Sequence, residues 1–156
     1  MKVGFDVDGV FAPDFEIPGS PSPRTIDLMI SARKLMVPLW NPLPICKELG
    51  YEVVFITSRP SSDKEDTRTF LKLLQHSLDT DELKLMIQPS NKPLSLEDAA
   101  EFKATAITSE KVGVFIESCP RQAGLIRAQV GLVCVYTFQS VVLNGLSSIL
   151  RSTCFM

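Results

Sequence analysis

Five short apolar runs alternate with helical patterns along most of this chain, and each run is closed by polar or turn residues. The runs lie at residues 3–5, 51–56, 84–87, 112–116 and 130–138. They are rich in Val, Ile and Phe, a composition typical of strands that are buried on both faces. Because such parallel strands need helices on both sides, the alternation predicts a doubly wound α/β fold, a three-layer sandwich with a mostly parallel five-stranded sheet.

Apolar residues at helical spacing predict the helices between these strands. They lie at residues 64–78, 96–107, 120–128 and 140–150. Ser95 and Asp98 have the spacing of an N-terminal capping pair, so we expect the second of these helices to begin directly after Ser95.

Residues 11–44 interrupt the alternation, because they hold seven of the eleven prolines and a single helical pattern at 25–36. We expect a flap or small cap over one end of the strands, closed by Phe11 and Trp40, although these aromatic rings are also suited to pack a substrate base. A chain of 156 residues falls within the ~100–200 residues of one domain, so residues 1–156 are expected to share one core.

Charge and residue counts exclude several kinds of protein. Sixteen Lys and Arg against eighteen Asp and Glu give a net charge of −2, without the basic excess that coats duplex nucleic acid. No apolar run reaches the ~18–20 residues of a membrane helix, so no membrane partner is expected. Four cysteines without a CxxC pair indicate reduced thiols and a cytoplasmic protein. The single histidine, His76, leaves the chemistry to carboxylates, hydroxyls and amines.

Polar residues follow the predicted strands in a fixed order. Asp6 and Asp8 come first with Gly9 beside them, Thr57 ends the second run, and Glu117 ends the fourth. Two aspartates so close together require a cation, and hard oxygen ligands favour Mg²⁺. The sequence therefore predicts a phosphate or metal site at the carboxyl ends of the strands.

These segments resemble the motifs of the haloacid dehalogenase (HAD) superfamily of phosphohydrolases. Residues 3–10, Val-Gly-Phe-Asp-Val-Asp-Gly-Val, resemble the first motif, and residues 53–57, Val-Val-Phe-Ile-Thr, resemble the second. Lys103 resembles the third, and residues 114–120, Val-Phe-Ile-Glu-Ser-Cys-Pro, resemble the fourth. The resemblance spans nearly the whole chain and implies a HAD-like Rossmannoid fold with a Mg²⁺-dependent phosphatase activity on phosphate monoesters.

The resemblance also implies a catalytic role for four residues. Asp6 is expected to be the nucleophile that becomes an aspartyl phosphate, and Asp8 the general acid and base. Thr57 is expected to donate a hydrogen bond to a phosphoryl oxygen, and Lys103 to neutralise charge on the nucleophile and the phosphoryl group.

Substrate and metal contacts follow from the same resemblance. Gly9, Ser58 and Arg59 are expected to bind substrate, although Arg59 is equally suited to stack over a loop. Mg²⁺ is expected to bind Asp6, Glu117 and the backbone carbonyl of Asp8.

Two positions depart from the family pattern. The fourth motif commonly has a second acid, whereas Ser118 and Arg121 stand at the two places where it occurs. This departure leaves open an alternative function, a catalytically degenerate HAD fold that serves as a binding or regulatory module. In addition, Lys92 in Asn-Lys-Pro resembles another form of the third motif and competes with Lys103 for that role.

The short connections leave no room for a full cap domain, so we expect an open site. Such a site suits bulky phosphate esters, or a homo-oligomer in which a neighbouring subunit forms the lid. The segments Asp-Val-Asp-Gly-Val and Ile-Thr-Ser-Arg-Pro are similar to those of deoxyribonucleotidase-like members. The expected substrates are a nucleoside monophosphate first and a 3′-phosphorylated nucleic-acid end second, and both are analogies to the family.

Overall fold

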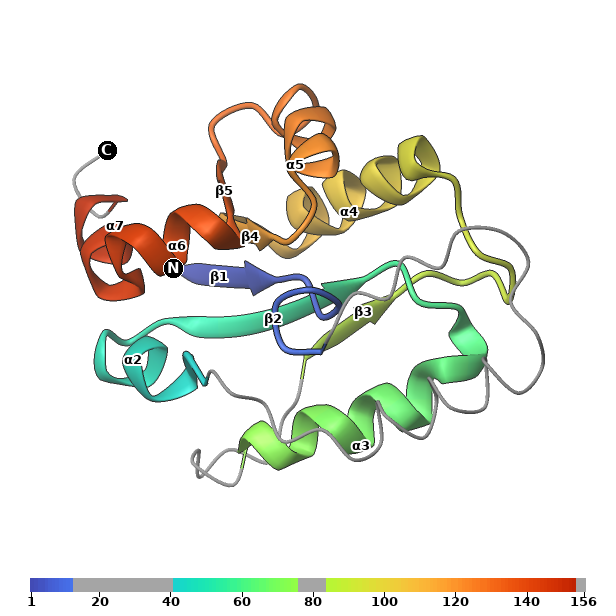
Figure 1. The fold of residues 1–156 in the computed structure, drawn as a ribbon, viewed down its shortest axis with the longest axis horizontal. Helices are drawn as coiled ribbons and strands as arrows, with labels where there is room; N and C mark the ends of the chain where they lie inside the picture. The colour runs from blue at the N-terminus through green and yellow to red at the C-terminus, as the bar shows by residue number, and fades with distance from the viewer. Residues whose placement is uncertain (13–40, 76–83, 154–156) are drawn as a thin grey trace.

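Five strands form one sheet in the computed structural model, which describes residues 1–12, 41–75 and 84–153 (Figure 1). The strands are β1 (Lys2–Phe5), β2 (Glu52–Thr57), β3 (Leu85–Ile87), β4 (Val112–Glu117) and β5 (Cys134–Thr137). Their order across the sheet is β3-β2-β1-β4-β5, and every neighbouring pair is parallel. The prediction of an α/β fold with a five-stranded parallel sheet is confirmed. The chain winds outward from the central strand β1 in two directions, as in Rossmann-like folds.

Helices connect the strands. Those described are α2 (Leu43–Glu48), α3 (Lys64–Gln75), α4 (Leu96–Glu110), α5 (Pro120–Arg127), α6 (Phe138–Asn144) and α7 (Leu146–Thr153), with a 3₁₀ turn at Ser61–Asp63. The predicted capping pair starts α4, because Ser95 Oγ accepts from Asp98 N at 3.1 Å and donates to Asp98 Oδ2 at 2.7 Å. No helix in this described part of the chain is both long and apolar enough to cross a membrane.

Glycines account for two differences from the predicted elements. The fifth strand is shorter than residues 130–138, because Gly131 adopts a φ of 62° and turns the chain before the strand begins. The helix predicted at 140–150 is two helices, α6 and α7, which are separated by Gly145 with a φ of 76°. Both conformations lie in the left-handed region that glycine adopts without strain.

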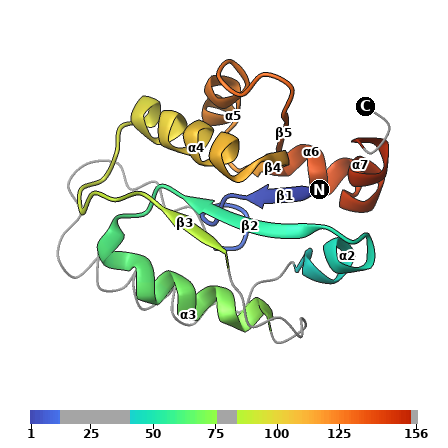
Figure 2. The same ribbon diagram turned by 180° about the vertical axis from the view of Figure 1, so that it is seen from behind.

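Apolar side chains form two clusters against the sheet. One cluster contains residues of α2, α3, α6 and α7, and the other contains residues of α4 and α5. Strand β2 contributes Phe55 to the first and Val54 and Ile56 to the second, as expected when successive side chains of a strand alternate between faces. Figures 1 and 2 show α4 and α5 on one side of the sheet and α2 and α3 on the other.

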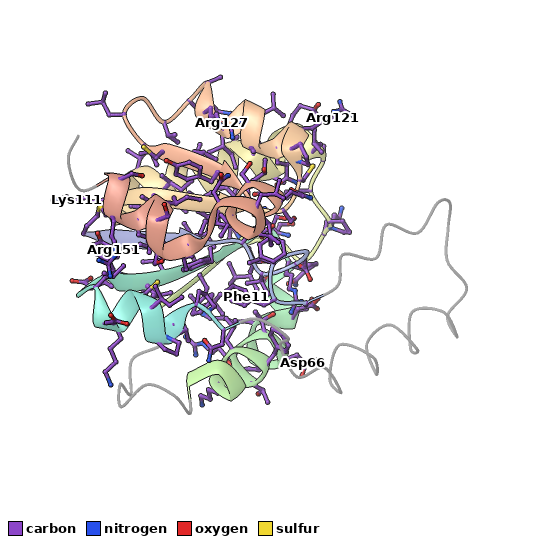
Figure 3. All side chains as sticks on the ribbon, turned by 60° about the vertical axis from the view of Figure 1, so that its left-hand side comes forward. Phe11, Asp66, Lys111, Arg121, Arg127 and Arg151 are labelled. Carbon is purple, nitrogen blue, oxygen red and sulfur yellow. The ribbon has the colours of Figure 1, made fainter. Side chains whose placement is uncertain are left out.

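The segment after β1 folds back onto the core. Phe11 is 4% exposed, and its ring meets the rings of Phe5 and Phe55 edge-on with centroids 5.6 Å apart. Phe11 is therefore a core residue, on the side of the sheet where α3 lies (Figure 3). Residues 13–40 of the predicted flap, including its helix at 25–36 and Trp40, lie outside the described residues, as does His76, while Leu43 and Pro44 begin α2.

Glycine is also needed at the centre of the sheet. A Cβ atom on Gly4 of β1 would lie 2.8 Å from Cδ2 of Phe115 on the neighbouring strand β4. The absence of a side chain at Gly4 thus lets the Phe115 ring lie against β1.

Candidate active site

Three neighbouring strands bring polar residues to one edge of the sheet. Asp6 follows β1, Thr57 ends β2, and Glu117 ends β4. Asp6 N donates to Ile116 O at 2.9 Å, so the pairing of β1 with β4 continues one residue beyond β1. Because β1 lies between β2 and β4, the predicted strand-end residues share the carboxyl edge of the sheet.

A buried lysine joins the acids of β1 and β4. Lys103 projects from α4, and its Nζ lies 3.1 Å from Asp6 Oδ2 and 2.8 Å from Glu117 Oε2. Asp6 is 4% exposed, Lys103 1% and Glu117 0%. We call these residues the Asp6–Lys103–Glu117 cluster. When both acids are ionised, two carboxylates and one ammonium leave one surplus negative charge out of contact with water, which is energetically costly.

Side chains on and before α5 complete the hydrogen bonding of this cluster. Gln122 Oε1 accepts from Lys103 Nζ at 2.8 Å. Ser118 Oγ lies 3.3 Å from Asp6 Oδ2 and 3.4 Å from Glu117 Oε1. Our sequence reasoning missed Gln122, because a glutamine within the first turn of a helix has no distinctive pattern. The only signal was its position five residues after Glu117.

Backbone donors fix the two acids from the other side. Val7 N donates to Asp6 Oδ1 at 2.8 Å, and Cys119 N donates to Glu117 Oε1 at 3.1 Å. Each acid therefore has a hydrogen-bond partner on both of its oxygens, which holds its orientation.

Burial and the neighbouring charges both shift the pKa values of Asp6 and Lys103. Burial raises the pKa of Asp6 well above its usual range; Lys103 acts against this shift, while Glu117 and Asp8 add to it. Burial disfavours the ammonium of Lys103, but Asp6 and Glu117 raise the pKa of Lys103 above its ordinary value. The lysine therefore stays charged, and burial disfavours ionisation of Asp6.

Asp8 lies in a second ion pair, which we call the Asp8–Arg59 pair. Arg59 Nε donates to Asp8 Oδ2 at 2.9 Å, and the terminal nitrogen NH2 donates to Asp8 Oδ1 at 2.6 Å. The other terminal nitrogen, NH1, donates to Thr67 Oγ1 on α3 at 3.1 Å. Burial disfavours the guanidinium charge, but the contact with Asp8 raises the pKa of Arg59.

The other residues predicted for substrate contact lie beside these two groups. Thr57 Oγ1 accepts from Arg59 N at 3.2 Å, and Ser58 between them is half-buried. Gly9 adopts a φ of 73° and its N donates to Ala12 O at 2.6 Å, which closes a tight turn after β1. Asp8 and Gly9 are both partly exposed at this edge.

The structure distinguishes the two lysines that the sequence left in competition. Lys103 contacts Asp6, whereas Lys92 is exposed in the segment after β3, where its carbonyl oxygen accepts from Gln88 Nε2 at 2.8 Å. Arg121, which stands at one of the two positions where the HAD pattern commonly has a second acid, is exposed on α5 (Figure 3).

Of the groups expected to hold Mg²⁺, two are side chains, and the structure brings these two together. Asp6 and Glu117 lie together, while the carboxylate of Asp8 faces Arg59. Within residues 1–12, 41–75 and 84–153, no group of three or more His, Cys, Asp or Glu side chains is placed to hold a metal ion. Among the described residues, the carboxylates of Asp6 and Glu117 are the two that a metal at this edge would meet.

Comparison of the chain with protein-family models, with curated proteins and with solved structures found no match.

Proposed function

We propose that this protein is a Mg²⁺-dependent phosphatase of the HAD type, which hydrolyses a phosphate monoester through an aspartyl phosphate on Asp6. The position of Asp6 is the observation that carries the proposal. It is a buried carboxylate at the carboxyl end of the central strand, 3.1 Å from the ammonium of Lys103. The strand order and the helices on both sides of the sheet support the three-layer Rossmannoid fold of that superfamily.

In the first half of the reaction, a carboxylate oxygen of Asp6 attacks phosphorus, and the bond from phosphorus to the ester oxygen breaks. Asp8 in its acid form gives its proton to that oxygen, so the leaving group departs as an alcohol. The Thr57 hydroxyl donates to a phosphoryl oxygen, while Lys103 offsets negative charge on Asp6 and the phosphoryl group.

In the second half, a water oxygen attacks phosphorus, and the bond from phosphorus to Asp6 breaks. Asp8, now a carboxylate, takes the proton of the water and returns to its acid form. The products are an alcohol and inorganic phosphate, and both aspartates are restored.

The donors of the Asp6–Lys103–Glu117 cluster fit Mg²⁺. Asp6, Glu117 and the backbone carbonyl of Asp8 would hold it, since Mg²⁺ takes hard oxygen ligands and needs only one or two carboxylates besides phosphate and water. The surplus negative charge in the buried cluster supports a divalent cation, and Ser118 adds a hydroxyl beside both acids. When bound, Mg²⁺ would act as a Lewis acid toward the phosphoryl oxygens.

The proposed substrate is a nucleoside monophosphate, with a 3′-phosphorylated nucleic-acid end as the second candidate. Both come from the resemblance of the motifs, and the short connections between β2 and α4 support an open site for such bulky esters. A homo-oligomer whose neighbouring subunit forms the lid fits the same open site. The three cysteine thiols that are free in the described part of the chain support a cytoplasmic protein.

A phosphatase screen tests the proposal. We expect Mg²⁺-dependent release of phosphate from at least one member of a panel of nucleoside monophosphates, sugar phosphates and 3′-phosphorylated oligonucleotides. Asp6→Asn should reduce this activity to less than about a hundredth, because the amide cannot attack phosphorus. Removal of a general acid or base alone already lowers the rate by roughly 10²–10⁴-fold, and loss of the nucleophile should cost at least as much. Retention of more activity in Asp6→Asn would exclude Asp6 as the nucleophile.

An alternative function is a catalytically degenerate HAD fold that binds a ligand or a partner without turnover. Two observations favour it: Ser118 stands in place of a second acid, and both carboxylate oxygens of Asp8 accept from Arg59. This alternative predicts no phosphate release in the screen, and a melting temperature that does not change with Mg²⁺ and beryllofluoride.

A further inference from the structure

The guanidinium of Arg59 is held by the protein on three of its nitrogen atoms. Nε and one terminal nitrogen bind the two oxygens of Asp8, while the other terminal nitrogen binds Thr67 Oγ1. Paired hydrogen bonds of this kind between arginine and a carboxylate restrict both side chains in position and orientation. Asp8, Arg59 and Thr67 come from three different segments: the turn after β1, the segment after β2, and α3.

Burial argues against a role for Arg59 in binding the substrate. Its side chain is 7% exposed, whereas that of Asp8 is 21% exposed. A substrate anion that engaged Arg59 would have to displace Asp8 from a buried guanidinium, and breaking such a pair leaves an uncompensated charge. Asp8 is thus the member of the pair that is presented to solvent at the carboxyl edge of the sheet.

We infer that Arg59 is a positioning residue for the two proton transfers of Asp8 and that Thr67 anchors it. The inference rests on the function proposed above and goes beyond it, because it replaces the substrate contact that the sequence suggested for Arg59.

The geometry of the pair is compatible with proton transfer by Asp8. A carboxylate has about four lone-pair sites, and the paired contact with Arg59 uses one on each oxygen. The contact with Arg59 therefore does not itself occupy the lone pair that would carry the proton given to the ester oxygen in the first step and taken from water in the second. Arg59 fixes the direction in which these lone pairs point.

The test compares Arg59→Lys with wild type on two substrates. Lysine keeps the positive charge but cannot form the paired contact. With a nucleoside monophosphate, whose leaving group needs a proton, we expect kcat to fall about 10–100-fold and KM to stay within about twofold. With p-nitrophenyl phosphate, whose leaving group needs none, we expect a rapid burst of nitrophenol to remain and only the later steady state to slow.

Further variants separate positioning from a structural role. Asp8→Asn should show the same contrast between substrates, and the double variant with Arg59→Lys should be no slower than Asp8→Asn alone. Thr67→Val should reproduce part of the Arg59→Lys effect, and Thr67→Ser, which keeps the hydroxyl, should restore it. Arg68→Lys on α3 is the matched control and should change the kinetics on neither substrate, because its side chain is 43% exposed and contacts only Glu65 among the ion pairs described.

The outcomes distinguish the two proposals. A rise of KM on both substrates with kcat unchanged would make Arg59 a substrate contact and overturn the inference alone. The inference would also be overturned if Arg59→Lys lowered kcat equally on both substrates and removed the burst, or if it had no effect. It would be overturned as well if the losses of Arg59→Lys and Asp8→Asn were additive in the double variant. Absence of turnover in wild type, or turnover that survives Asp6→Asn, would overturn both this inference and the proposed function.

Discussion

Replacement of Asp6 by asparagine should make the protein more stable at neutral pH, although it removes the proposed nucleophile. The raised pKa of Asp6 means that the folded protein holds this proton more tightly than the unfolded chain. The stability contributed by the proton is complete below the ordinary carboxyl pKa near 4 and is lost as pH rises through the raised folded-state pKa. Asparagine has no such charge, so its stability should lack this decline.

The magnitude follows from the number of protons. One proton changes the free energy of unfolding by at most about 1.4 kcal/mol per pH unit between the two pKa values. For a chain of this size that slope corresponds to roughly 3–6 °C in melting temperature per pH unit. The charged side chains that act on the pKa of Asp6 are Lys103, Glu117 and Asp8.

Mg²⁺ should offset the same surplus charge in wild type. We expect Mg²⁺ at ten times its dissociation constant to stabilise wild type by about 1.4 kcal/mol at pH 8. The stabilisation of wild type should be smaller at pH 5, and Mg²⁺ should stabilise Asp6→Asn little at either pH. The assay is a thermal melt across pH 4–9, with and without Mg²⁺, at matched ionic strength. Glu101→Gln, at an exposed acid on the same helix as Lys103, is the control and should follow wild type.

Two results would refute this reasoning. If the stability of Asp6→Asn followed the wild-type pH profile, the surplus negative charge would not lie on Asp6. If Mg²⁺ stabilised both proteins equally, the cation would bind elsewhere.

The remaining predictions concern the sheet and the metal ligands. Gly4→Ala should destabilise the protein by about 1–3 kcal/mol in chemical denaturation, because its Cβ would lie 2.8 Å from the Phe115 ring. Gly124→Ala, on α5 with nothing within 4 Å of its Cβ, should instead stabilise by up to about 1 kcal/mol; loss of stability in both variants would contradict the steric reason. Glu117→Gln should raise the Mg²⁺ concentration for half-maximal rate with little change in KM, and Ser118→Asp should lower it. An unchanged Mg²⁺ dependence in Glu117→Gln would show that Glu117 is not a ligand.

The sequence predicted the sheet well, because buried parallel strands have a strong apolar pattern that polar residues end sharply. It also predicted that Asp6, Thr57 and Glu117 would share one edge, since the carboxyl ends of parallel strands meet there. The helix at 43–48 was not predicted, because its first two residues lie in the proline-rich segment 11–44 and it is only six residues long.

The pairing of side chains within the site was harder to predict than their location. Spacing along the chain does not show that Arg59 turns toward Asp8, or that Gln122 reaches Lys103, because both contacts join segments far apart in sequence. It also did not show that the short segment after β1 turns at Gly9 and buries Phe11 in the core. Such contacts depend on how the loops pack, which a single sequence without its relatives encodes only weakly.

The central place of β1 in the sheet has a consequence for the kinetics of folding. β1 pairs with β4 more than 100 residues away, and the hydrogen bond from Ser118 to Asp6 spans 112 residues. Contacts of such long sequence separation form slowly, because the chain must close a large loop first. The local helices α3 and α4 can therefore regain their hydrogen bonds while the acids at the ends of β1 and β4 are still apart. During refolding, the far-ultraviolet helical signal should return before any phosphatase activity does.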